Sequence, residues 1–270
     1  MRNDVCATRG RSPRSERLRI LKTPYLSIII PTRRLEGRLR RRIASSLSRL
    51  PSTEVLVVEP EEDMGSPAGE RAVDSLLADE KGKAAAGFRL LKARRGRGFQ
   101  CNRGAQAARG ELLLFLHDDT GLPDGALQLI ERRFEDPAVG AACFKLRFDN
   151  RHWLLGIYAF FTRFDSLFTT FGDQGIVIRR AFFEELGGFP DWPLFEDVEL
   201  GRRIRRRSRV VKLPAAVTTS AERFERNGVV RQQLGNAWLI LRFLLGTNPE
   251  SLAASYERHR SRSWGSGQCH

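Results

Sequence analysis

The chain has 270 residues, of which 41% are hydrophobic and 29% charged, a balance that allows one large α/β domain or two small ones and suits a soluble protein. The formal net charge is +14, but residues 1–50 hold fourteen Lys or Arg and three acids, so this segment alone carries +11. Such a segment could attract nucleic acid, acidic lipid or a polyphosphate. A solvated tail and a charged helix face explain it more simply, so the charge says little about a site elsewhere.

The cysteines form no C-x-x-C pair, which argues against a disulfide framework and a zinc site; they are Cys6, Cys101, Cys143 and Cys269. A reducing compartment fits this usage, and we expect a cytoplasmic protein. The first 19 residues lack the apolar core of a secretory signal. The apolar run at 237–245 is broken by Arg242 and falls short of the about 20 residues that span a bilayer. We therefore expect no transmembrane segment and, at most, peripheral membrane contact.

The first half of the chain alternates short apolar runs with helical patterns. After a disordered basic extension at 1–22, we expect strands at 26–30, 55–58, 88–91 and 112–116, and helices at 37–49, 68–79 and 99–109. Continuous apolar strands that alternate with helices predict βαβ units and a parallel sheet. Ligands of such sheets bind at the carboxyl ends of the strands, so the residues that follow each strand are the first candidates for a site.

The second half of the chain is less regular. We expect strands at 143–148 and 175–178, and helices at 153–171, 181–186, 195–206, 229–246 and 249–258. The helix at 153–171 is rich in aromatic residues, and we expect some of them to be exposed beside the candidate site. There they would form either an apolar groove for an acceptor substrate or the contact of a homodimer. Residues 23–260 are predicted to form a single domain, and residues 261–270 a flexible tail.

Two adjacent carboxylates follow the fourth strand, in the sequence His117-Asp118-Asp119-Thr120. Like charges at this distance repel each other unless a cation lies beside them. A divalent metal ion is the simplest such cation, because Mg²⁺ binds one or two carboxylates and takes its other ligands from water and substrate phosphates. The alternative is a polar turn in which Thr120 caps the helix that follows.

A second acidic pair, Glu196-Asp197, opens a predicted helix. The helix dipole alone favours acids in a first turn. The functional interpretation is a general base, because a direct displacement by a hydroxyl group requires one group that takes the proton of that hydroxyl.

A segment rich in glycine and arginine, 94–104, precedes the third helix. Glycine lets the backbone approach a ligand closely, and arginine matches phosphate oxygens. The segment fits neither the dinucleotide-binding fingerprint nor the P-loop. On its own it is better explained as a solvated basic loop.

Taken in order, these motifs resemble the family 2 glycosyltransferases, which have the GT-A fold. The resemblance covers about residues 25–258 and is closest to a small soluble subgroup with a G-R-x-x-Q-x-N-x-G-A segment before F-L-H-x-D-T. The matching segments are GRGFQCNRGA at 96–105, FLHDDT at 115–120, FGDQG at 171–175, GGFPDWP at 187–193, EDVEL at 196–200 and TSAERFERNG at 219–228. It implies an α/β, Rossmann-like, mostly parallel sheet with C-terminal helices, and a metal-dependent, inverting transfer of sugar from a nucleotide-diphosphate donor.

The resemblance also implies roles for single residues. Asp119 matches the metal-binding aspartate, with Asp118 and His117 as helpers and Mn²⁺ or Mg²⁺ as the cofactor, and Asp197 matches the base, with Glu196 beside it. The nucleotide-sugar side comprises Pro31, Thr32, Glu59, Arg97, Gln100 and Asn102. The side of the acceptor, which the sequence does not identify, comprises Gly172, Asp173, Gln174, Trp192 and Arg223.

Two segments depart from the family pattern, and both lie at the expected nucleoside pocket. The family has Asn-Glu after the first-strand proline, where this chain has Thr32-Arg33, and Asp-Gly-Gly-Ser after the second strand, where it has Glu59-Pro60-Glu61-Glu62. A binding protein that keeps the GT-A fold without activity is therefore an alternative. A nucleic-acid-binding protein is a weaker one, because no helix-turn-helix or zinc spacing supports it and no nucleic acid is expected.

Overall fold

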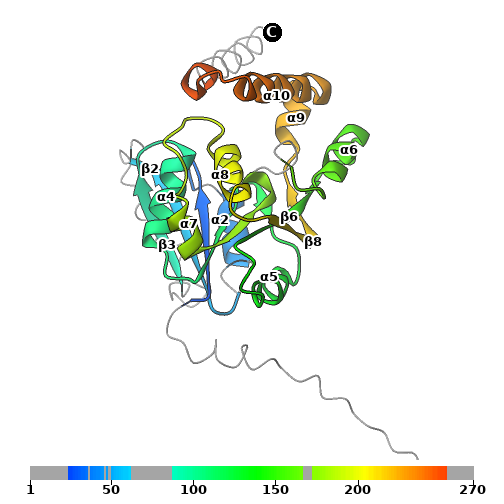
Figure 1. Cartoon of the computed structure of the whole chain (residues 1–270). Coiled ribbons are helices and arrows are strands. Elements are labelled where there is room, and N and C mark those ends of the chain that lie inside the picture. The colour runs from blue at the N-terminus through cyan, green and yellow to red at the C-terminus, as the bar shows by residue number, and fades with distance from the viewer. Residues whose placement is uncertain are drawn as a thin grey trace, which may run out of the picture.

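The computed structural model describes residues 24–35, 37–45, 47, 50–61, 87–166 and 172–253. An eight-stranded sheet runs through the molecule in the order β3-β2-β1-β4-β7-β6-β8-β5 (Figure 1). The strands are β1 (Leu26–Pro31), β2 (Thr53–Pro60), β3 (Phe88–Ala93), β4 (Leu112–Phe115), β5 (Thr120–Gly121), β6 (Ala141–Phe148), β7 (Ile176–Arg179) and β8 (Val210–Thr219).

The first four long strands form a parallel half of the sheet, as the apolar runs predict. β1 pairs in parallel with β2 and β4, and β2 pairs in parallel with β3. β7 is antiparallel to both β4 and β6, and β8 is parallel to β6 and antiparallel to the short β5. The carboxyl ends of β1, β2 and β4 therefore meet at one edge of the sheet.

Helices cover both faces of this sheet, because alternate strand residues point to opposite faces. Ile28 and Ile30 pack with α2 (Gly37–Ser45) and α5 (Ala126–Phe134) on one face. Ile29 packs with α4 (Arg97–Ala107) and α8 (Glu196–Arg205) on the other. The remaining helices are α6 (Trp153–Phe161), η3 (Gly172–Gln174), α7 (Arg180–Glu185), α9 (Glu222–Asn227) and α10 (Val229–Leu244).

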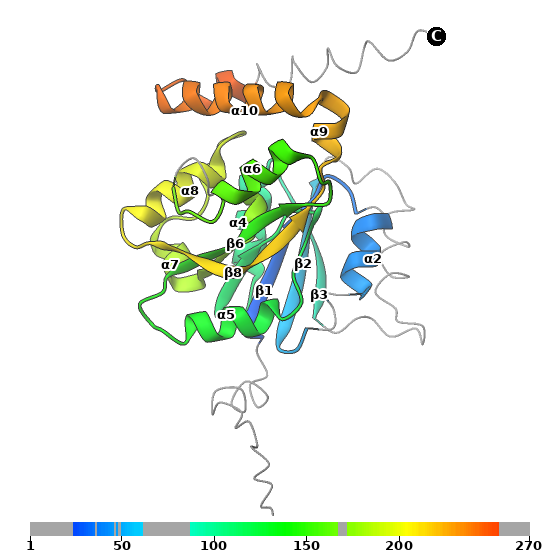
Figure 2. The same ribbon diagram turned by 90° about the vertical axis from the view of Figure 1, so that its right-hand side faces the viewer.

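Two views show α10 across the end of the molecule opposite to α5, with α6 beside it (Figures 1 and 2). None of the helices in the described part of the chain is long and apolar enough to cross a membrane. The aromatic segment forms a helix only to Phe161, and Phe168 and Phe171 lie outside the described residues. Exposure is confirmed for several of its rings, which are Trp153, Phe160, Phe161 and Phe164.

Four elements were not predicted from the sequence: β5, η3, α9 and β8. The helix expected after Thr120 in the polar-turn alternative is present as α5. β8 pairs with β6 through a register shift, in which the single residue Phe144 of β6 opposes the three residues of β8 between Lys212 and Ala216. Pro214 lies inside this shift, so the apolar residues of β8 do not alternate regularly. The expected extension at 1–22, helix at 68–79 and tail at 261–270 lie outside the described residues, as does the expected helix at 249–258 beyond residue 253.

The close packing of α4 on β1 leads to a stability prediction. A Cβ atom at Gly104 would lie 2.4 Å from Cγ2 of the buried Ile29. Gly104→Ala should therefore lower the free energy of unfolding by about 1–3 kcal/mol in denaturant titrations, since a packed core resists an added methyl group. Gly156→Ala on α6 is the matched control, because nothing lies within 4 Å of the added Cβ and stability should hold or rise. Equal effects of the two changes would contradict this packing.

Candidate active site

The ends of β1 and β2 are joined by the side chain of Gln100, which comes from the first turn of α4. Its Nε2 donates to the carbonyl oxygen of Thr32 at 2.7 Å and to that of Val58 at 2.6 Å. Both amide hydrogens are therefore used, and the side chain is 6% exposed. Gln100 thus fixes the spacing of the two strands on the expected nucleotide side of the site.

Glu59 holds the loop that follows β1. Its Oε1 accepts from the backbone N–H of Leu35 at 2.6 Å, and its Oε2 accepts from Nζ of Lys92 at 2.7 Å. The buried carboxylate is therefore paired with a cation and with a backbone donor. Pro31 and Thr32 lie at the start of the same loop, so the structure brings these three predicted residues together.

The acid motif after β4 is tied to three different elements. Oδ2 of Asp118 accepts from the hydroxyl of Thr32 at 2.7 Å, and its backbone carbonyl accepts from the guanidinium of Arg42 on α2. Oδ1 of Asp119 accepts from the hydroxyls of Thr120 at 3.1 Å and Thr219 at 3.3 Å. The latter bond depends on the pairing of β5 with β8.

The Asp118 and Asp119 side chains are both exposed, so a ligand can reach them. The described residues include no cluster of three or more His, Cys, Asp or Glu side chains that could hold a metal ion. One or two exposed carboxylates do suit an ion that takes its other ligands from water and a diphosphate. His117 fits this ion less well, because its Nε2 lies 3.2 Å from a guanidinium nitrogen of Arg97.

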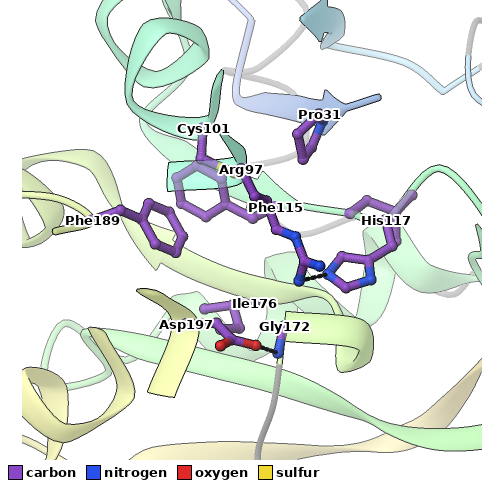
Figure 3. Close-up of a pocket in the computed structure, with 10 residues that line it drawn as sticks. Pro31, Arg97, Cys101, Phe115, His117, Gly172, Ile176, Phe189 and Asp197 are labelled. Carbon is purple, nitrogen blue, oxygen red and sulfur yellow. Dashed lines mark hydrogen bonds between the residues drawn. The ribbon is translucent and has the colours of Figure 1, made fainter. Parts of the chain in front are cut away.

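Arg97 connects α4 to α8 and to the end of β4. Its Nε lies 3.3 Å from Oε1 of Glu196, in an ion pair without hydrogen-bond geometry, and its other end reaches the ring of His117 (Figure 3). Burial raises the pKa of the Glu196 carboxyl, Arg97 opposes this rise, and Asp197 adds to it. Burial lowers the pKa of Arg97, but Glu196 and Asp197 raise it by more, so the guanidinium stays charged.

Asp197 is held in place by two backbone donors. Its Oδ2 accepts from the N–H of Gly172 at 2.7 Å, and its Oδ1 accepts from the N–H of Val198 at 2.8 Å. A Cβ atom at Gly172 would lie 3.0 Å from Oδ2 and 3.1 Å from Nε2 of His117, so a glycine permits this close approach. The two bonds leave further lone pairs of the carboxylate for a ligand.

A pocket lies between these elements. Its polar lining comes from Arg97, His117, Gly172 and Asp197, and Pro31 closes one side (Figure 3). The apolar lining is Cys101, Phe115, Leu116, Ile176 and Phe189. The pocket therefore joins residues expected on the nucleotide side to the expected base.

Asp173 and Gln174 follow Gly172 in η3 and differ in their partners. Oδ1 of Asp173 is buried and has no hydrogen-bond partner among the described residues. Burial, then Asp197 and Asp119, raise the pKa of Asp173 from 3.8 to about 7. Oε1 of Gln174 accepts from Nζ of Lys212 at 2.7 Å and from the thiol of Cys143 at 3.7 Å.

The other predicted residues lie around this pocket rather than in its lining. Asn102 forms two hydrogen bonds with the backbone of Phe189, at 2.9 and 3.0 Å, and so fixes the loop before α8. Trp192 packs edge-on against Phe243 of α10, with ring centroids 5.8 Å apart. Arg223 belongs to α9, and its side chain lies outside what the structure describes.

Two residues near the site were not predicted from the sequence. Arg42 was assigned to the solvent face of its helix, and Lys212 lies on the unpredicted β8. Tyr158 belongs to the aromatic helix that was expected beside the site; burial raises the pKa of its hydroxyl, and the charges of Asp173 and Asp197 add to this rise. The sequence did contain a signal for Arg42, because this arginine lies on the same helix face as Leu39 and Ile43, which are buried.

This arrangement of sheet and helices is the GT-A fold, which solved glycosyltransferases share. The mannosyltransferase PcManGT from Pyrobaculum calidifontis, solved with GDP-Man and Mn²⁺, has a TM-score of 0.57 and 16% identity, over 95% of this chain and 82% of that one. TarS 1-349 from S. aureus, solved with UDP-GlcNAc, has a TM-score of 0.53 and 18% identity, over 72% of this chain and 58% of that one. At such identities the likeness concerns the fold.

The profile of the family described as "Glycosyl transferase family 2" matches residues 27–184, which is more than half of the chain. The chain therefore belongs to glycosyl transferase family 2. An uncharacterized protein of Mycobacterium tuberculosis (strain CDC 1551 / Oshkosh) is 30% identical over 185 residues. The matched region covers 57% of this chain and 58% of that relative, so this chain spans little more than half of the relative's length.

The raised pKa of Asp173 predicts a pH-dependent stability. A carboxyl that binds its proton more tightly in the folded state stabilises that state below pH 3.8, and this contribution is lost as the pH rises through about 7. The unfolding free energy of the wild type should therefore fall relative to that of Asp173→Asn over this range, by at most about 4 kcal/mol. Denaturant titrations at several pH values measure the difference. Asp124→Asn, at an exposed carboxylate, is the control, and a constant difference for Asp173→Asn would refute the raised pKa.

Proposed function

We propose that this enzyme transfers a sugar from a nucleotide-diphosphate donor to an acceptor hydroxyl, with inversion at the anomeric carbon. The observation that carries the proposal is the pocket that Asp197 shares with Arg97, His117 and Pro31. Structural neighbours were solved with GDP-Man and with UDP-GlcNAc, which supports a donor of this class. The buried thiols of Cys101 and Cys143 suit a reducing, cytoplasmic location.

Asp197 takes the role of general base. The acceptor oxygen forms its bond to the anomeric carbon as the bond from that carbon to the diphosphate breaks, and the proton of the acceptor hydroxyl passes to the Asp197 carboxylate. The backbone donors of Gly172 and Val198 orient this carboxylate. Glu196 beside it is held by Arg97 and is less free to accept the proton.

Asp119 and Asp118 would hold Mn²⁺ or Mg²⁺ at the donor end of the site. When bound, such an ion neutralises the charge that develops on the leaving diphosphate. The backbone and side chain of Asp118 are fixed by Arg42 and Thr32, and Asp119 by Thr120 and Thr219. Mn²⁺ in one structural neighbour supports a metal of this kind.

The remaining residues divide into two groups. Pro31, Thr32 and Glu59 line the nucleoside side, where Gln100 and Asn102 act by positioning the loops around the donor. Gly172, Asp173, Gln174, Trp192 and Arg223 form the acceptor side. We assign this activity to one catalytic domain at residues 23–260.

A substitution at the base separates chemistry from donor binding. Asp197→Asn keeps the size of the side chain but cannot accept a proton, so kcat should fall by about 10²–10⁴ while the Kd for the nucleotide sugar stays within about threefold. Product formation and calorimetric titration of the donor measure the two quantities. Asp124→Asn should leave both unchanged. A normal kcat in Asp197→Asn would assign the base to another residue, with Glu196→Gln the next variant to measure.

A substitution at the metal site should weaken donor binding as well as transfer. Asp119→Ala removes the carboxylate that Thr120 and Thr219 orient, so it should weaken Mn²⁺-dependent donor binding and reduce transfer by at least about 10². EDTA should reduce wild-type activity similarly, and added Mn²⁺ should restore it only in the wild type. Full activity of the variant, or of the EDTA-treated wild type, would exclude the metal role.

A further inference from the structure

Helix α10 is apolar on two opposite sides. One side packs on the body of the enzyme: Phe243 is 9% exposed and stacks on Phe195, with ring centroids 4.8 Å apart, and Leu239 packs in the same cluster. The other side faces solvent, with exposed fractions of 39–77% at Val230, Leu234, Trp238, Leu241, Leu244 and Leu245. At about 100° per residue these exposed side chains share one stripe, centred opposite to Phe243 and Leu239.

Helix α6 extends this apolar surface. It contacts α10 and lies beside it at the same end of the molecule (Figure 2). Trp153, Ile157, Phe160 and Phe161 are 47–67% exposed, as is Phe164 just after the helix at 54%. Every large hydrophobic residue that is exposed in the described part of the chain belongs to α6, α10 or the few residues after them. An apolar surface concentrated in this way marks an interaction site.

The charges in this surface have one sign. Residues 151–164 contain Arg151 and Arg163 and no acid, and residues 226–246 contain three arginines and no acid. The guanidinium of Arg163 lies over the exposed ring of Phe160, 4.4 Å from its centroid. The neighbouring acids Asp165 and Glu222 are each paired with an arginine, Arg205 and Arg226. Apolar and aromatic side chains interspersed with cations are the pattern of an interfacial helix on an anionic membrane, where Trp lies at headgroup level.

We propose that the outer faces of α6 and α10 dock on a lipid bilayer whose headgroups are negatively charged. The apolar stripe enters the boundary between headgroups and acyl chains, and the arginines contact lipid phosphates. A second copy of this chain suits the surface less well, because it would bring the arginines of α6 and α10 in one copy against those of the other. Residues 254–270 offer few apolar side chains to cover it.

This docking surface is independent of the chemistry proposed for the pocket. Its residues line no part of that pocket, so a failed vesicle experiment leaves the transferase proposal intact, and the reverse also holds. The two are connected through the cluster around Phe243 of α10, on which Trp192 and Phe195 pack, and Phe195 directly precedes Glu196.

The test is sedimentation of the full chain with phosphatidylcholine vesicles, with and without phosphatidylglycerol, at low and high salt. The wild type should bind only the anionic vesicles, and brominated lipid should quench its tryptophan fluorescence. Leu234→Ser/Trp238→Ser should weaken partition by at least about tenfold, because it removes apolar area from the bilayer. Trp153→Phe/Trp238→Phe keeps that area, so it should still bind but lose most of the quenching.

A charge-matched pair of variants tests the arginines. Arg163→Ala/Arg231→Ala should weaken partition by about tenfold, since each cation at the membrane surface contributes to binding. Arg132→Ala/Arg133→Ala removes the same charge from α5, at the opposite end of the molecule, and should change partition by less than about threefold. Circular dichroism and size-exclusion chromatography confirm the fold of each variant.

Three results would overturn the proposal. The first is no binding of the wild type to anionic vesicles at low salt. The second is binding that Leu234→Ser/Trp238→Ser leaves unchanged, which would assign it to the basic segment at the start of the chain. The third is a concentration-dependent dimer that the same variant abolishes and vesicles do not dissociate, which would assign the surface to a second copy.

Discussion

The ion pair between Arg97 and Glu196 is the contact on which the pocket depends. Each residue belongs to the first turn of its helix, so one pair fixes the start of α4 against the start of α8. Glu196 is 3% exposed, and a carboxylate buried to this degree without a cation would destabilise the fold by several kcal/mol. Gly98 permits the approach, because a Cβ atom there would lie 2.8 Å from the carbonyl oxygen of Pro190. The same guanidinium reaches His117, so a single side chain orders three segments of the site.

The entry into α8 is strained and supported from outside the sheet. Phe195 has φ of +65°, a left-handed conformation that a bulky residue adopts only where its surroundings impose it. Those surroundings include α10, through the stacking of Phe195 on Phe243, and Trp192 packs on the same ring. The position of Asp197, two residues further on, therefore depends on a helix that contributes nothing to the pocket lining. Two adjacent residues, such as Glu196 and Asp197, can thus be held in position by a helix that is distant in the sequence.

The parallel half of the fold could be predicted because its strands are continuous apolar runs, such as Leu112–Phe115, and their parallel direction follows from βαβ connections. The grouping of Pro31, Thr32, Glu59 and His117 followed from the same rule. The second half of the fold could not be predicted in this way, because Pro214 and a register shift interrupt the alternation of apolar residues along β8. Since β8 was not predicted, the position of Lys212 on it was missed as well. The pairing of Arg97 with Glu196 joins residues 99 positions apart, and neither local pattern indicates its partner. Gln100 and Asn102 were recognised as residues of the site, but their bonds to backbone groups come from the tertiary structure alone.

The pairing of β5 with β8 has a consequence for the order in which the chain can fold during its synthesis. β1 to β4 are complete once residue 115 has emerged from the ribosome, and this parallel half can collapse early. Asp119 follows four residues later, yet one of the two hydroxyls that orient it belongs to Thr219. The acid motif therefore waits for a hundred further residues of chain before its geometry is complete. A nascent chain can thus hold a folded parallel scaffold before the acid motif at its edge is ordered.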